Sequence, residues 1–163
     1  MNPQRRHRLL LFIRMMYGGS RSMSFSFWQK WLSIAAGAVV AIGLFLALTG
    51  FLPYSEPVNR LINQTFWPGR AVSVETSDFQ RWVYGILGAT VAGWGVLLLF
   101  VARVPFKKKE PWSRQAILIC LAVWFPLDTA LSLYHGVYLN AAFNATLAMA
   151  IGLPAAITGR FFR

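Results

Sequence analysis

The chain has 163 residues, of which 56% are hydrophobic and 13% are charged, whereas a soluble domain carries about 25% charged residues. Its net charge is +11, but the basic residues flank long apolar runs, so we expect them to orient a membrane protein and attract anionic lipids, with no nucleic-acid partner. The single cysteine, Cys120, excludes an internal disulfide, and the two distant histidines, His7 and His135, argue against a metal or haem site, so we expect no cofactor.

Residues 1–30 carry six basic side chains and no acid. Four apolar residues of this segment share one helical face, namely Leu9, Phe12, Ile13 and Met16. Two interpretations stay open, a cationic helix on the membrane surface or a basic tail that only sets orientation. The apolar core at 9–13 is short for a signal peptide, so we expect no cleavage. Met23 is an alternative translation start.

Four apolar runs follow, at 31–52, 82–102, 116–134 and 139–157. Each approaches the ~20 residues that an α-helix needs to cross a ~30 Å hydrocarbon core. We therefore predict an all-α integral membrane bundle of four transmembrane helices in residues 31–163. Small residues are spaced four apart in the first two runs, which favours close helix contacts; the pairs are Gly37/Ala41, Gly43/Ala47, Gly88/Ala92 and Ala89/Gly93.

The segment 53–81 is the one long link between spans. Its Ser55-Glu56-Pro57 start predicts a short interfacial helix, with Phe66 and Trp67 near the lipid headgroups. At the end of the link, residues 77–80 (SDFQ) read as a capping box that opens the second span.

Prolines and charges organise the second half of the chain. Pro111 stands where the third helix is expected to begin, Pro126 is expected to bend it, and residues 135–138 form a hairpin. Basic residues number six in the N-terminal segment, five in the second link and two at the C-terminus, against three in the first link and none in the hairpin. The rule that basic residues stay inside predicts that both termini are cytoplasmic.

One acid, Asp128, lies inside an apolar run, where an unpaired carboxylate is costly, so we expect it to face inward and find partners. Asp128, Ser132 and His135 follow helical spacing on one face. The hairpin places Asn144 at the depth of Asp128, and Asn140 lies one turn away. The second helix would add Arg81 and Tyr84 to this polar cluster. Asn144 and Arg81 are the expected partners of Asp128.

Three interpretations of this cluster stay open. It is a satisfied network that locks three helices together, or a site for a ligand, proton or ion in which Asp128 and His135 relay protons, or a coincidence of spacing. The tryptophans divide similarly. Four of them flank the spans as expected interfacial anchors, namely Trp28, Trp31, Trp82 and Trp112. Trp94 and Trp124 lie near mid-span, where core packing or contact with a pigment or quinone are the alternatives.

Three segments resemble small bacterial four-helix membrane proteins of the inner membrane, to which no function is attached: 79–95 (FQRWVYGILGATVAGWG), 105–112 (PFKKKEPW) and 124–144 (WFPLDTALSLYHGVYLNAAFN). The four-span layout is also loosely similar to DoxX-like proteins. The resemblance implies fold and compartment, and it carries no residue roles. Small multidrug transporters share the helix number but rely on an acid in the first span, which this chain lacks.

These features predict a structural or accessory subunit that binds lipids, other membrane proteins or a second copy of itself. A transporter or proton-coupled carrier that uses Asp128 is the alternative. A membrane enzyme comes last, because no nucleophile–base pair or metal-ligand spacing is present and no catalytic residue can be named.

Overall fold

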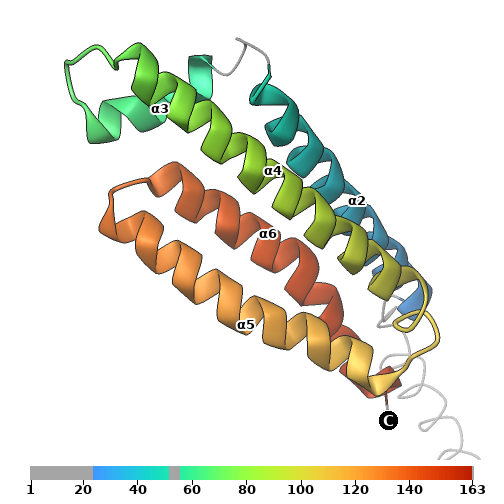
Figure 1. Ribbon diagram of the computed structural model, residues 1–163. Helices are drawn as coiled ribbons and strands as arrows, with labels where there is room; N and C mark the ends of the chain where they lie inside the picture. Colours follow the sequence, from blue (N-terminus) through green and yellow to red (C-terminus); the bar gives the residue numbers. More distant parts are fainter. Residues whose placement is uncertain (1–23, 52–55, 163) are drawn as a thin grey trace, which may run out of the picture.

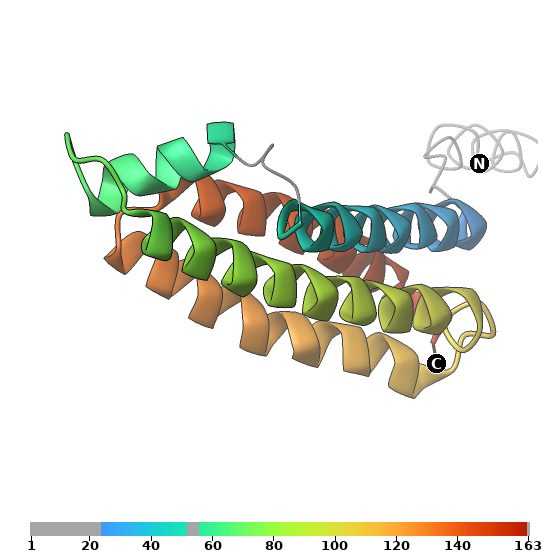
Figure 2. The same ribbon diagram turned by 45° about the horizontal axis from the view of Figure 1, so that its top comes forward.

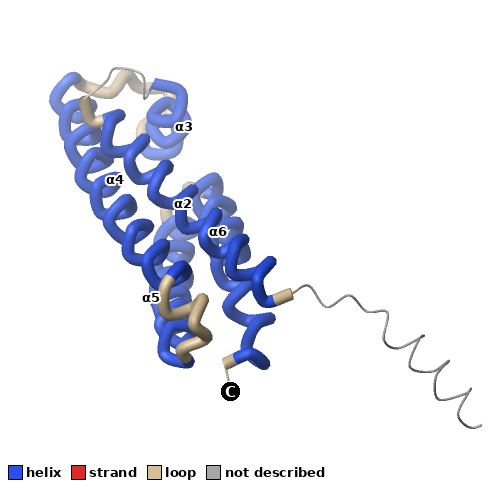
Figure 3. The backbone as a smooth tube through the Cα atoms, turned by 90° about the vertical axis from the view of Figure 1, so that its right-hand side faces the viewer, coloured by secondary structure: helices blue, strands red, loops and turns tan. Residues whose placement is uncertain are grey.

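The computed structural model describes residues 24–51 and 56–162, and these residues contain no strand. Within these ranges four long helices form a bundle: α2 (Phe25–Thr49), α4 (Val74–Arg103), α5 (Pro111–Tyr134) and α6 (Tyr138–Ile157). The shorter α3 (Glu56–Phe66) lies across one end, and the 3-10 turn η2 (Thr158–Phe161) ends the chain at the other (Figures 1, 2 and 3). All four long helices are long and apolar enough to span a membrane, which indicates a multi-pass membrane protein. The predicted N-terminal helix lies outside the described residues.

The all-α bundle and the helix within the first link are confirmed, but the four long helices all begin earlier than the apolar runs, α2 and α4 most of all. The Ser24 side chain caps α2, accepting from the Phe27 N–H at 3.4 Å. Ser73 caps α4 by accepting from the Thr76 N–H at 3.3 Å. The capping box predicted at 77–80 is therefore wrong, because a better-placed hydroxyl precedes it by one turn. As expected, Pro111 is the first residue of α5.

Glycines set the close contact between α2 and α4. A Cβ added to Gly43 would overlap the backbone of Ala92, and one added to Gly88 would overlap the backbone of Ala47. At Gly95 the added atom would lie 2.7 Å from the Val40 nitrogen. Two helix backbones can approach this closely only where side chains are missing. The small-residue prediction is confirmed for this face of the two helices.

A second set of small residues points away from the bundle. An added Cβ at Gly37 or Gly93 would meet nothing within 4 Å. Ala89, one turn before Gly93, is exposed. The expected contact of Gly93 with a neighbouring helix is therefore absent from the described part of the chain.

Trp31 joins α2 to α6 by a hydrogen bond that the sequence reasoning missed. Its indole Nε1 donates to the backbone oxygen of Ala150 at 3.0 Å. In a regular helix this oxygen would accept from the residue four positions later, which is Pro154 and has no N–H. Trp31 supplies the missing donor, so it also has a structural role between α2 and α6.

Two other side chains donate to carbonyls near helix ends. Gln29 donates through Nε2 to the Ala102 oxygen at 3.0 Å, which ties α2 to the last turn of α4. Arg114 donates through Nε to the Ala155 oxygen at 2.7 Å, which ties α5 to α6. The last carbonyls of a helix lack intrahelical hydrogen-bond donors, and lipid chains have none to offer. Both bonds therefore supply these carbonyl oxygens with a donor.

The glycine contact predicts that Gly88→Leu destabilises the bundle strongly, whereas Gly93→Leu does not. The new side chain at Gly88 meets backbone on α2 and forces the helices apart, which costs about 3 kcal/mol or more. Thermal melting of the purified variants in detergent measures the difference. Equal melting of the two variants would show that the close contact is wrongly placed.

The Trp31 bond predicts coupling between Trp31→Phe and Pro154→Ala. Alone, Trp31→Phe leaves the Ala150 oxygen unpaired, at about 1–3 kcal/mol. Pro154→Ala introduces an N–H for that oxygen, so in this background the cost of Trp31→Phe should fall by about 1 kcal/mol. A double-mutant cycle by thermal melting measures this coupling, because lost packing at Trp31 is common to both backgrounds. Additive costs would contradict the interpretation.

Candidate functional site

Asp128 on α5 accepts hydrogen bonds through both of its carboxylate oxygens. Oδ1 accepts from Asn140 Nδ2 at 2.8 Å and from Asn144 Nδ2 at 2.9 Å, both on α6. Ser132 Oγ lies 3.3 Å from the same oxygen. Oδ2 accepts from Trp124 Nε1 at 3.1 Å. These five residues are called the Asp128 network below.

Helical spacing and the hairpin together assemble the Asp128 network. Its three members on α5 are four residues apart, so they share one face of that helix. Asn140 and Asn144 are likewise one turn apart on α6. Gly136 turns the chain between the helices with φ +72°, a left-handed conformation that suits glycine. The predicted partnership of Asp128 with Asn144 is confirmed.

Further bonds within the Asp128 network hold its donors in place. Ser132 Oγ donates to the Asp128 backbone oxygen at 2.7 Å, and Asn140 Nδ2 also donates to Ser132 Oγ at 2.8 Å. Asn144 is 2% exposed and Ser132 is 7% exposed. Every side-chain group that faces the carboxylate is a donor, which suits a carboxylate that only accepts. The arrangement fastens α5 to α6.

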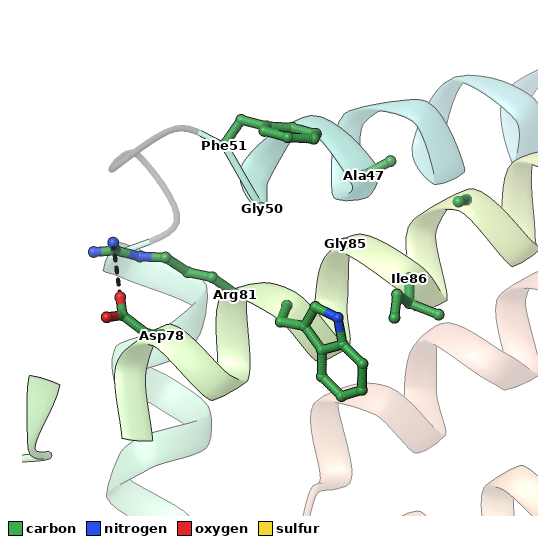
Figure 4. Close-up of a pocket in the computed structure, with 9 residues that line it drawn as sticks. Ala47, Gly50, Phe51, Asp78, Arg81, Gly85 and Ile86 are labelled. Carbon is green, nitrogen blue, oxygen red and sulfur yellow. Dashed lines mark hydrogen bonds and ion pairs between the residues drawn. The ribbon is translucent and has the colours of Figure 1, made fainter. Parts of the chain in front are cut away.

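Arg81 does not reach Asp128, so that predicted pair is wrong. Its guanidinium instead pairs with Asp78, with 3.3 Å between Nη1 and Oδ1 (Figure 4). Both residues line a cleft of about 510 Å³ between the end of α2 and the start of α4. Arg81 lies on a part-exposed side of α4, where a nearby acid one turn away is the closer partner.

His135 and Tyr84 also lie outside the Asp128 network. His135 directly follows α5 and is exposed, with its ring 5.7 Å from that of Phe66 on α3 and 4.9 Å from that of Tyr134. Tyr84 is half-buried on α4, and in the described ranges no hydrogen bond joins it to the network. The expected relay between Asp128 and His135 has no geometric support.

Trp124 is the member that the sequence reasoning missed. It stands four residues before Asp128, a spacing that predicts a shared helix face. Its ring lies 5.7 Å from that of Trp94 on α4, so the tryptophan pair links the Asp128 network to a third helix. Packing is therefore the observed role of these two mid-span tryptophans.

The helix α3 covers the hairpin end of the bundle. Gln80 of α4 donates through Nε2 to Asn63 Oδ1 at 2.7 Å. Phe66 contacts His135, as given above, so α3 bridges the start of α4 and the α5–α6 hairpin. Among the described residues no group of three His, Cys, Asp or Glu side chains is placed to hold a metal ion.

Comparisons with protein-family models, with curated proteins and with solved structures found no match to this chain. The local geometry therefore carries the functional argument.

The Asp128 network predicts a small loss of stability for one substitution of Asp128 and a large loss for another. Asp128→Asn keeps one acceptor oxygen and loses chiefly the bond from Trp124, at about 1 kcal/mol. Asp128→Leu strands the N–H groups of Trp124, Asn140 and Asn144, and should lower the free energy of unfolding by about 3 kcal/mol or more. Thermal melting in detergent ranks them against the wild type. A leucine variant as stable as the wild type would refute a structural role for the carboxylate.

Proposed function

We propose that this chain is a structural or accessory membrane protein that binds a transmembrane helix of a partner through the outer face of α4. The observation that carries this proposal is the division of small residues on α4. Gly88 and Ala92 are buried against α2, whereas Ala89 and Gly93 are exposed. A second helix can approach closely at the exposed pair, as α2 does at the buried one.

The closed geometry of the Asp128 network supports this function over carriage of a proton or ion. Its hydrogen bonds run between α5 and α6, and its polar groups are donors to one another or to the carboxylate. A carrier would have to break several of these bonds in each cycle. If Asp128 carries protons, Asp128→Asn should fold normally and lose pH-dependent flux in proteoliposomes.

The proposed setting is the inner membrane of a bacterium, with both termini in the cytoplasm. The uneven distribution of basic residues supports this orientation, because thirteen of them flank one side of the bundle and three flank the other. A second copy of the chain is one candidate partner for α4.

The proposal predicts that Ala89→Leu/Gly93→Leu abolishes capture of the partner. Both positions are exposed, an added Cβ at Gly93 would meet nothing within 4 Å, and Ala89 borders the open cleft beside the end of α2, so folding should survive. Native membranes are cross-linked, and the protein is purified with whatever remains attached. Mass spectrometry identifies the attached chain and separates a second copy from a different protein.

The matched control is Ala122→Leu/Ala130→Leu, which likewise places two leucines at exposed positions, here on α5. The control should retain the partner at the wild-type level. Equal retention by both double variants would show that α4 is not the binding face. Equal loss in both would also count against it, because the effect would then be unspecific.

A further inference from the structure

A cleft of about 400 Å³ opens between α2 and α4 at the end of the bundle away from α3. It is lined by Gln29, Lys30, Ser33, Ile34, Arg103 and Lys107. Its volume falls in the range of about 300–1,000 Å³ that small-molecule sites occupy. The Asp128 network and the exposed face of α4 share none of these residues.

Three cations meet in this cleft from three parts of the chain. Lys30 comes from the second turn of α2, Arg103 from the last turn of α4, and Lys107 from the link that follows. No acid lines the cleft, and in the described ranges no ion pair involves any of the three. Residues 1–23 and 52–55, which lie outside the described ranges, contain no Asp or Glu.

The floor of the cleft is held by hydrogen bonds between the two helices. Gln29 Nε2 donates to Ser33 Oγ at 3.1 Å and to the Ala102 oxygen at 3.0 Å. These bonds set the relative position of the helix segments that carry Lys30 and Arg103. The start of α2 and the end of α4 meet here, and their opposite end charges offset each other, so the side chains decide the local potential.

One wall of the cleft is apolar. Ile34 stands one turn beyond Lys30 and is 74% exposed. The site therefore places cations beside a hydrocarbon surface, at the end of two helices long enough to span a membrane. A ligand that carries both an anionic phosphate and an acyl chain matches both features, whereas a free phosphate matches only the first.

We propose that this cleft binds the headgroup of an anionic phospholipid. The phosphodiester oxygens accept from Lys30, Arg103 and Lys107, and an acyl chain lies along Ile34. Arg103 is the residue best suited to grip two phosphate oxygens at once. The proposal goes beyond the binding of a partner helix by α4, since the cleft shares no residue with the exposed pair Ala89 and Gly93.

The test measures lipid retention by native mass spectrometry of the full chain in a mild detergent. Phosphatidylglycerol, phosphatidylcholine and inorganic phosphate are the probes, each added at the same concentrations. The variant is Arg103→Gln/Lys107→Gln. The control is Arg70→Gln/Lys108→Gln, which removes the same charge from exposed positions that do not line the cleft.

The wild type should prefer phosphatidylglycerol to phosphatidylcholine. The cleft variant should bind it about 25-fold more weakly, since each Lys or Arg near a membrane surface contributes roughly a fivefold factor. The control should stay within about twofold of the wild type, and added salt should weaken the preference.

Three results would overturn the site. The first is an equal weakening of phosphatidylglycerol binding in both double variants, and the second is no preference between the two lipids. The third is displacement of the lipid by inorganic phosphate at equal concentration, which would indicate a site for a soluble anion. Partner capture through Ala89 and Gly93 is measured separately on α4. Failure of the lipid site therefore leaves that result standing, and failure of partner capture leaves lipid selectivity intact.

Discussion

The fold depends on one constraint, that polar groups within a hydrocarbon layer must be satisfied by the protein itself. Trp31 donates to the Ala150 carbonyl that Pro154 leaves without a partner. Gln29 and Arg114 donate to carbonyls near the ends of α4 and α6. Each bond runs from one helix to another, so meeting the constraint also joins the helices. The Asp128 network follows the same logic with a side chain as the acceptor.

The bundle is built from two helix pairs joined in different ways. The pair of α2 and α4 relies on missing side chains, because Gly43, Gly88 and Gly95 let the backbones touch. The pair of α5 and α6 relies on polar bonds around Asp128 and on the Arg114 bond. Trp31 on α2 and the contact between Trp94 and Trp124 connect one pair to the other. Close contacts at glycines thus stabilise the pair of α2 and α4, and side-chain hydrogen bonds stabilise the pair of α5 and α6.

The surfaces that remain free to bind a partner or a lipid follow from how the two helix pairs are joined. A carboxylate surrounded by internal donors offers little to a ligand, so the surfaces carry the functional proposals. The outer face of α4 repeats the small-residue chemistry of its inner face, and the cationic cleft lies where no acid is available to neutralise it. One surface suits another helix and the other suits an anionic lipid.

Much of the candidate site could be predicted from the sequence. A lone acid in an apolar run requires a partner, and a four-residue hairpin fixes the depth of Asn144 relative to Asp128 by helical rise alone. The partner Arg81 could not be predicted correctly, because its direction depends on how α4 is rotated against its neighbours. The glycine contact with α2 sets that rotation, which directs Arg81 to the cleft beside α2 and away from Asp128. Asp78, one turn earlier on α4, is then its partner.

The class of the protein, the number of long helices and the pairing across the hairpin can be predicted from the sequence alone. These follow from hydrophobic length, from helical periodicity and from short connections, all of which are local. The packed bundle was needed to show which glycines are buried, that Trp31 donates to the Ala150 oxygen, and that Lys30, Arg103 and Lys107 share a cleft. These features depend on how each helix is rotated about its axis and on contacts between residues distant in the sequence. A rotation of α4 by one residue would place Ala89 against α2 and leave Gly88 on the surface.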